Sequence, residues 1–236
     1  MVSGELKIRR GDSAGAADVG LYWRMETWIR NRLSLVDSMF GATGPIYALR
    51  RELFVPVPES ILLDDMYLPL AAFFRGYRLL MEESAIAWDL PTSAETEFTR
   101  KVRTLAGNYQ LLAHYPGLLL PWRNRLWLHY LSYKMGRLLL PWLLMAILLG
   151  SFFVPAPLMY YALTLQGMVY ALALADPLIG QTNLLKSASS PLRTFCLMML
   201  AAMSAVRIFW TDPRSLWVVT YASAGPAVGP SSTTSR

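Results

Sequence analysis

"LLLPWLLMAILLGSFFVPAPLMYYALTLQGMVYALALA", residues 138–175, contains no charged side chain. A membrane helix needs about 20 apolar residues, so this stretch is too long for a single span. The prolines of "PAP" at 155–157 divide it, because proline interrupts a helix. The sequence therefore predicts membrane helices over about 138–154 and 158–175. The alternative is a helical hairpin buried in a soluble core.

A third apolar stretch, "LRTFCLMMLAAMSAVRIFW", covers residues 192–210. Arg193 and Arg207 bound its charge-free centre, and arginines near helix ends can reach the membrane surface. We expect a third membrane helix here, after a polar linker over 176–191. The remaining residues, 211–236, are rich in small and polar side chains, which predicts a disordered tail.

Charge is distributed unevenly along the 236 residues. Residues 1–137 carry 17 Lys/Arg and 14 Asp/Glu, whereas 138–236 carry 5 and 2. The net charge of +6 comes with no recognised nucleic-acid motif, so we expect no nucleic-acid partner and instead expect contact with anionic lipids. The single cysteine, Cys196, excludes a disulfide framework within the chain.

Basic residues cluster just before the first predicted span, whereas the loop at 155–157 has none. The positive-inside rule then places residues 1–137 in the cytoplasm of an integral inner- or plasma-membrane protein. Residues 114–137 contain the amphipathic "WRNRLWLHYLSYKMGR", which predicts a segment in the membrane interface. The alternative is a soluble helix that packs on the polar domain.

The polar part, residues 1–113, reads as a mixed α/β domain. "PIYAL" (45–49) suits a short strand, and a helix is expected over about 66–76 with Gly76 at its end. "YRLLMEE" (77–83) suits the next strand, and the pattern of 94–115 predicts a long helix. The first twenty residues read as a polar loop, with no signal-peptide pattern.

Asp64 and Asp65 stand side by side within "ILLDDMYLPLAAFFRGYR" (61–78). One interpretation is an N-cap, in which an aspartate binds the free backbone N–H groups of the following helix. The other is a general base whose proton affinity is raised by a neighbouring carboxylate. Both roles are possible at once, one carboxylate capping and the other reacting.

Two further patterns suit a ligand site, although each also has a plain structural explanation. "GATG" (41–44) lets a backbone approach a ligand closely, or forms an ordinary turn. In "RKVRT" (100–104), Arg100 and Arg103 share one helix face, which suits either a diphosphate or a solvated surface.

Taken in order, these features resemble the second half of a membrane-integrated family-2 glycosyltransferase of the cellulose synthase and hyaluronan synthase kind. The resemblance covers about residues 35–210. "TGPIYALRR" matches the family's acceptor-site segment, with Thr43 in place of its cysteine and Gly44 on its glycine. "LDD" (63–65) matches its T-E-D, which makes Asp65 the implied catalytic base and puts Asp64 in place of glutamate.

"RKVRT" matches the family's Q-x-x-R-W, with Arg103 on the arginine, Arg100 replacing glutamine and Thr104 replacing tryptophan. The resemblance implies a partial GT-A-like domain followed by interfacial helices and about three membrane helices. It also implies inverting transfer from a nucleotide-sugar donor to a glycan or lipid acceptor. The family's divalent Mg or Mn ion is expected, but its D-x-D ligands are not in this chain. The chain would then be a fragment, have a misplaced start or work with a separate N-terminal half. The rival hypothesis is a non-catalytic membrane assembly subunit.

Overall fold

The computed structural model describes residues 1–8, 16–89, 94–180 and 184–216. Most of this part is helical, with a small mixed sheet. The strands are β1 (Val2–Ile8), β2 (Tyr47–Ala48) and β3 (Leu80–Asp89). The α-helices are α1 (Ala16–Val36), α2 (Asp64–Phe74), α3 (Ala94–His114), α4 (Trp127–Tyr130), α5 (Gly136–Gly150), α6 (Ala156–Ala175) and α7 (Lys186–Ala205).

Short turns of other helix types join these elements. A π-helical turn, Leu131–Met135, links α4 to α5, so that helical backbone runs without a break from Trp127 into α5. The 3-10 turns are Arg51–Leu53, Pro116–Leu119, Ser151–Phe153, Asp176–Leu178, Val206–Phe209 and Pro213–Leu216.

The sheet has the order β2-β1-β3, with β1 antiparallel to β2 and parallel to β3. Gly4 permits this pairing, because a Cβ there would lie 2.3 Å from the carbonyl oxygen of Ala85. The expectation of a loop over residues 1–20 is wrong for β1 and for the start of α1. The segment "VSGELKI" contains a glycine and has no regular alternation of polar and apolar residues, so its sequence does not predict a strand. It is a strand because it pairs with β2 and β3.

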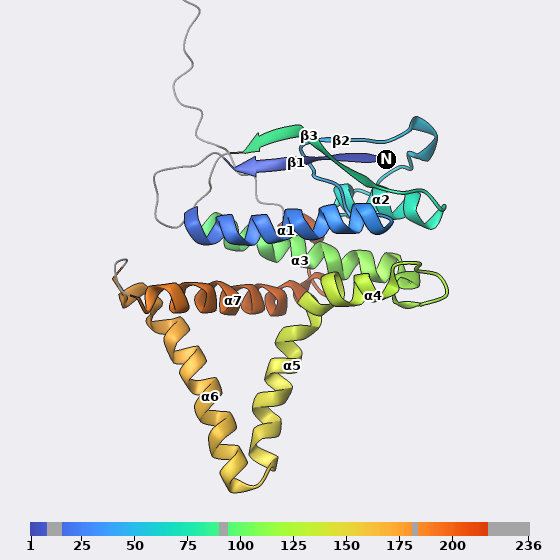
Figure 1. The fold of residues 1–236 in the computed structure, drawn as a ribbon. Helices are drawn as coiled ribbons and strands as arrows, with labels where there is room; N and C mark the ends of the chain where they lie inside the picture. Colours follow the sequence, from blue (N-terminus) through green and yellow to red (C-terminus); the bar gives the residue numbers. More distant parts are fainter. Residues whose placement is uncertain (9–15, 90–93, 181–183, 217–236) are drawn as a thin grey trace, which may run out of the picture.

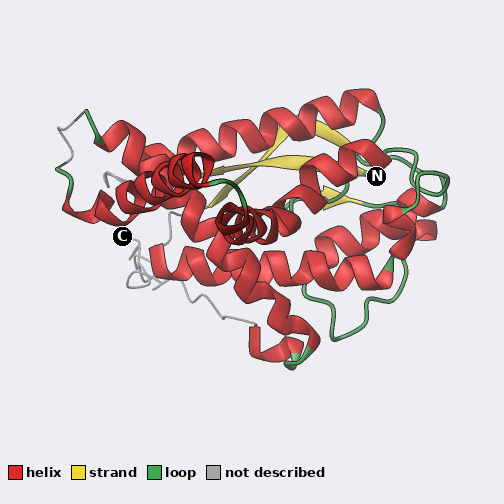
Figure 2. Cartoon of the chain, turned by 90° about the horizontal axis from the view of Figure 1, so that it is seen from below, coloured by secondary structure: helices red, strands yellow, loops and turns green. Residues whose placement is uncertain are grey.

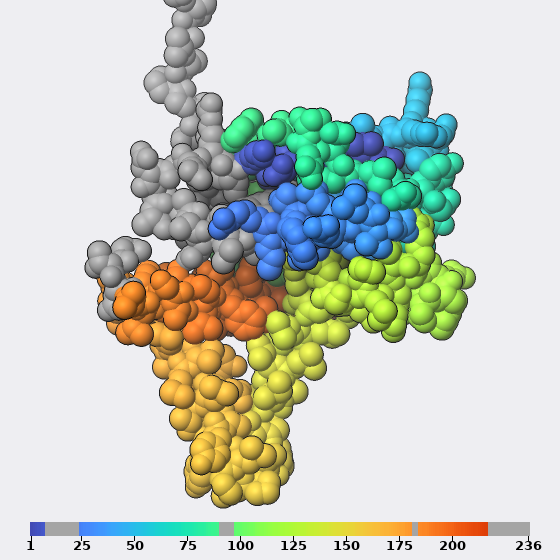
Figure 3. All heavy atoms as spheres, viewed as in Figure 1, coloured from blue at the N-terminus to red at the C-terminus, as the bar shows by residue number. Residues whose placement is uncertain are grey.

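The elements form layers (Figure 1). The sheet covers α1 and α3, and α7 and α4 lie beneath these two helices. Below them α5 and α6 form a V-shaped hairpin that stands clear of the rest of the molecule in the space-filling view (Figure 3). Seen from below, the hairpin is viewed nearly along its length (Figure 2).

The hydrophobic core joins the first half of the chain to the segment expected in the membrane interface. Tyr130 is 1% exposed and its ring lies 5.2 Å from that of Phe40. Leu126 is also buried. Part of 114–137 therefore packs on the polar domain, which is the alternative to a segment that lies wholly in the membrane interface. Trp122 and Leu128 remain exposed.

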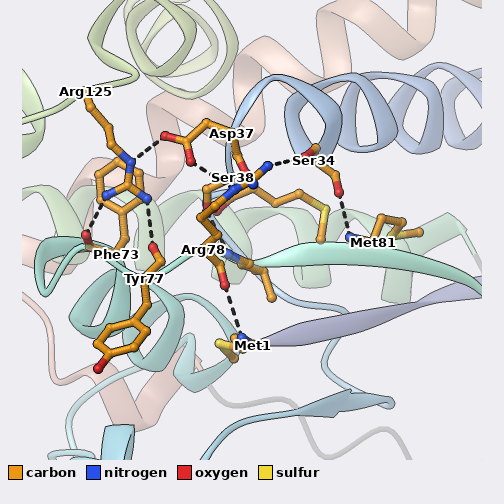
Figure 4. Close-up of polar contacts among 11 residues, drawn as sticks. Met1, Ser34, Asp37, Ser38, Phe73, Tyr77, Arg78, Met81 and Arg125 are labelled. Atoms are coloured by element: carbon orange, nitrogen blue, oxygen red, sulfur yellow. Dashed lines mark hydrogen bonds and ion pairs between the residues drawn. The ribbon is translucent and has the colours of Figure 1, made fainter.

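A polar network centred on Arg125 and Asp37 fastens the end of α1 to the end of α2 (Figure 4). Arg125 ion-pairs with Asp37 and donates to the carbonyl oxygens of Phe73, at 2.9 Å, and Tyr77, at 2.7 Å. Arg78 donates to the carbonyl oxygen of Asp37 at 2.6 Å from the other side. The network therefore holds the segment before β3 against α1.

Three helical segments are long and apolar enough to cross a membrane: Trp127–Phe153, Ala156–Leu178 and Lys186–Phe209. This agrees with the expectation of three such helices, although the first and third begin earlier than predicted. Large apolar side chains of α5 and α6 are exposed, as expected of surfaces that face lipid: Leu143, Ile147, Leu149, Leu158, Leu165 and Leu174.

The third apolar helix, α7, differs in its packing from the hairpin. Ala201, Ala202 and Ala205 are fully buried in the domain core, and α7 runs beneath α3 across the open end of the V. The small alanines allow this close approach, and Phe209 beyond the helix meets the ring of Tyr109 at 6.0 Å.

Asp176 fixes the turn from α6 into α7. Its carboxylate is buried, accepts a hydrogen bond from Ser189 at 2.7 Å and pairs with Lys186 and Arg193 at 3.0 and 3.3 Å. The chain after α7 also returns to the domain, since Leu216 is buried. The prediction of disorder is therefore wrong for 211–216, and 217–236 lie outside the described residues.

Candidate functional site

Every site residue that the sequence predicts lines one cavity of about 550 Å³. The cavity lies between the loop before β2, the N-terminus of α2, α3 and the turn that leads into α5. The predicted residues are Thr43, Gly44, Asp64, Asp65, Arg100, Arg103 and Thr104.

Asp64 and Asp65 form the first turn of α2. Leu63 occupies the N-cap position and makes no side-chain cap, so the helix starts earlier than predicted and neither aspartate caps it. Both carboxylates still lie at the positive end of the helix dipole, which favours negative charge. Asp64 is exposed, whereas Asp65 is half-buried beside the cavity.

Pro69 ties the Gly-rich loop to the acidic pair. Proline has no N–H, so it cannot bond to the carbonyl four residues earlier in the helix, which belongs to Asp65. That carbonyl oxygen instead accepts a hydrogen bond from the backbone N–H of Ala42 at 2.7 Å. The loop 41–44 is thereby held over the Asp65 side chain.

Gly44 leaves room for the Asp65 carboxylate, since a Cβ on Gly44 would lie 3.3 Å from Oδ2. Thr43 has a structural contact: its hydroxyl donates to the carbonyl oxygen of Gly4 at 2.7 Å, and it is buried. Thr104 donates to the backbone of Arg100, on its own helix, at 2.9 Å. Within "TGPIYALRR", Gly44 thus lies directly against the Asp65 carboxylate.

Burial raises the pKa of Asp65 to about 6. The neighbouring Asp64 acts in the same direction, whereas Lys134, Arg30 and Arg103 oppose it. The Oδ1 atom of Asp65 is buried and meets no hydrogen-bond donor among the described residues. A carboxylate of this kind accepts a proton readily near neutral pH.

Arg103 reaches the acidic pair from α3. Gly107, one turn further along, lets α3 pack against the segment before α2, because a Cβ there would lie 2.4 Å from Cγ of Leu63. Burial and the nearby Arg100 lower the pKa of Arg103, and Asp65 counteracts them. Arginine stays protonated in proteins, so a fixed positive charge faces Asp65.

A second polar group at the cavity was not predicted as part of the site. Glu26 of α1 accepts hydrogen bonds from Tyr133 and, at 2.7 Å, from Arg137. Burial alone would raise the pKa of Glu26, but Lys134 and Arg137 lower it to about 2. The sequence gives little indication of this group, because Lys134 and Arg137 there indicate only which side of the membrane residues 1–137 occupy.

The described residues do not fit a divalent-metal site. Within them there is no group of three or more His, Cys, Asp or Glu side chains that could hold an ion. Of the carboxylates at the cavity, Glu26 pairs with Arg137 and Glu97 with Lys101, which leaves only the adjacent Asp64 and Asp65.

Comparison of this chain with protein-family models, with curated proteins and with solved structures finds no match. The fold class that is established is a mostly helical chain with a small mixed sheet and three helices capable of crossing a membrane. The cavity around Asp65 is its candidate functional site.

Proposed function

We propose that this chain carries the catalytic base of a membrane glycosyltransferase. It would transfer a sugar from a nucleotide-sugar donor, with inversion, to a glycan or lipid acceptor at the cytoplasmic membrane face. The observation that carries the proposal is the pairing of a poised carboxylate, Asp65, with the fixed charge of Arg103 in one cavity.

The chemistry follows from these two groups. The acceptor hydroxyl attacks the anomeric carbon of the donor while Asp65 accepts the hydroxyl proton. The bond from that carbon to the diphosphate oxygen breaks, and its electron pair leaves with the diphosphate. Arg103, with Arg100 one turn away, stabilises the developing negative charge. Because the described carboxylates do not fit a metal site, no step here uses a metal.

The test is Asp65→Asn introduced into the chain in its source cells, so that any partner segment is present. Membranes from these cells are supplied with radiolabelled nucleotide sugars, and label in the lipid and polymer fractions is measured. A lost general base should lower transfer about 100-fold or more. Glu52→Gln removes an exposed carboxylate outside the cavity and should leave transfer unchanged. Equal transfer by Asp65→Asn and wild type would instead support the non-catalytic assembly subunit.

Membrane placement forms part of the proposal. We propose that only the α5–α6 hairpin crosses the bilayer, while α7 lies along its cytoplasmic face with its alanine-rich side on α3. Three observations support this: the buried alanines, the return of Leu216 to the core and the ion pair of Arg214 with Glu59. Residues 1–137 and the end of α7 would then share the cytoplasmic side.

This placement is tested by single-cysteine labelling in a Cys196→Ser background. Cysteines at Glu59 and Trp210 should react with an impermeant maleimide from the same side of sealed vesicles, and a cysteine at Phe153 from the opposite side. Trp210 and Phe153 are 80% and 89% exposed, so the introduced thiols are accessible. Labelling of Trp210→Cys from the side of Phe153→Cys would show three crossings.

A further inference from the structure

The cationic side chains at the cavity include two pairs that come from different parts of the fold. Arg100 and Arg103 come from α3, and Arg103 interacts with Asp64 and Asp65. Lys134 and Arg30 come from the turn before α5 and from α1; they interact with Asp65 and with each other. One donor diphosphate accounts for the first group, which leaves the second without a role in the proposed reaction.

The second group is only partly neutralised by its own surroundings. Glu26 is hydrogen-bonded to Tyr133 and Arg137, so the charge that it exerts on Lys134 is shared with Arg137. In the part of the chain that the structure describes, the ammonium of Lys134 meets no carboxylate at ion-pair distance. It lies 3.9 Å from the thioether sulfur of Met66 and 4.9 Å from the ring centre of Tyr133.

Arg30 uses one N–H on the carbonyl oxygen of Gly41 at 2.9 Å, and its guanidinium also lines the cavity. Both cations are half-buried and repel each other, and a bound anion would relieve that repulsion. Lys134 and Arg30 thus form the two cationic walls of an anion subsite, which we call the Lys134 subsite.

The Lys134 subsite lies at the membrane end of the cavity. Lys134 is four residues, about 6 Å along a helix, from the start of the charge-free stretch at Leu138. Met198 of α7, the helix with the exposed apolar side chains Leu197 and Leu200, lines the same cavity. In the proposed membrane placement, a ligand that fills this end has its anionic group near the lipid head groups.

We propose that the Lys134 subsite binds the phosphate of a membrane lipid whose head group carries a hydroxyl, and directs that hydroxyl to the carboxylate of Asp65. The inference rests on the proposed function and names its acceptor class. The hydroxyl oxygen forms the new bond to the anomeric carbon and its proton passes to Asp65. The donor diphosphate leaves on the Arg103 side.

The experiment measures binding, so that it does not depend on transfer. The full chain in detergent micelles is titrated with acyl-labelled phosphatidylglycerol, whose head group carries both a phosphate and hydroxyls. Acyl-labelled phosphatidylcholine is the control lipid. Lys134→Met should weaken phosphatidylglycerol binding about tenfold, the effect of one lost charge-assisted hydrogen bond. Arg30→Gln removes the other cation of the subsite and should also weaken phosphatidylglycerol binding, which makes it an independent second test.

Arg207→Met is the matched control, because Arg207 is an exposed cation at the end of α7, away from the cavity. It should change the affinity less than twofold. Equal weakening by Arg207→Met and Lys134→Met would overturn the proposal, since binding would then be general surface attraction. Soluble glycerol 3-phosphate that competes at the concentration of the lipid would overturn the membrane source.

Failure of this inference differs from failure of the proposed function. If lipid binding depends on Lys134 but Asp65→Asn leaves sugar transfer unchanged, the lipid subsite stands and the assignment of the base falls. If Asp65→Asn abolishes transfer while Lys134→Met binds phosphatidylglycerol as wild type does, the base stands and the lipid subsite falls.

Discussion

Asp65→Asn is expected to stabilise the fold at neutral pH while it abolishes sugar transfer. In the folded chain burial and Asp64 raise the pKa of Asp65 from 3.8 to about 6. Keeping Asp65 ionised at pH 7 therefore costs the folded state about 3 kcal/mol relative to the unfolded chain. Asparagine has nearly the same shape and carries no charge, so the variant avoids this cost.

The pH dependence has a definite sign. Because the folded pKa is the higher one, the folded chain keeps a proton on Asp65 that the unfolded chain releases between pH 3.8 and about 6. Wild-type stability from this group is fully present below pH 3.8 and is lost as the pH rises through 6. The advantage of the variant should grow from about 0.5 kcal/mol at pH 4 to about 3 kcal/mol at pH 7.

Thermal unfolding of the detergent-solubilised chain at pH 4 and pH 7 checks this expectation. For a chain of this length 1 kcal/mol shifts the midpoint by about 2–4 °C, so the variant should melt roughly 6–12 °C higher at pH 7. Glu52→Gln, which removes an exposed carboxylate, should melt with the wild type at both pH values. Coinciding midpoints of Asp65→Asn and wild type at pH 7 would refute the reasoning.

The remaining predictions concern packing and charge. Gly107→Ala should lower stability by about 1–3 kcal/mol, because its methyl group collides with Leu63, whereas Gly167→Ala has open space and should be near neutral; thermal midpoints compare them. Arg125→Met loses an ion pair and two hydrogen bonds to backbone carbonyls, so it should lower the free energy of unfolding by about 2 kcal/mol. Arg123→Met should leave the free energy of unfolding unchanged, because Arg123 is exposed and has no ion pair within the described ranges. Asp64→Asn should move the acidic limb of the transfer rate to lower pH, since the like charge beside the base is removed.

The cavity residues could be predicted because each lies in a local pattern that positions it. Asp65 begins a helix, Arg103 is on the cavity side of an amphipathic helix, and Gly44 precedes a short strand. The contacts that bring them together are long-range, but each depends on one residue: Pro69 leaves a carbonyl free for the loop, and Gly107 allows α3 to approach. The candidate base Asp65, the nearby Arg103 and the two apolar helices of the hairpin could therefore be predicted from the sequence.

The rest depends on long-range pairing that no local pattern contains. β1 is a strand because it pairs with β3, which lies more than seventy residues later in the chain. Glu26 meets its partner Arg137, which is 111 residues away, so neither could be assigned to the site from its neighbours in sequence.

The clearest case is α7. Its apolar composition suits a membrane span, yet a stripe of alanines at 201, 202 and 205 serves equally well to pack a helix beneath a domain. Hydropathy measures how apolar a segment is and not what covers it. Here the covering helix is α3, the same helix that carries Arg103. In the proposed placement, α7 therefore lies between the bilayer and the cavity that Met198 lines, and this is why the acceptor that we propose is a lipid.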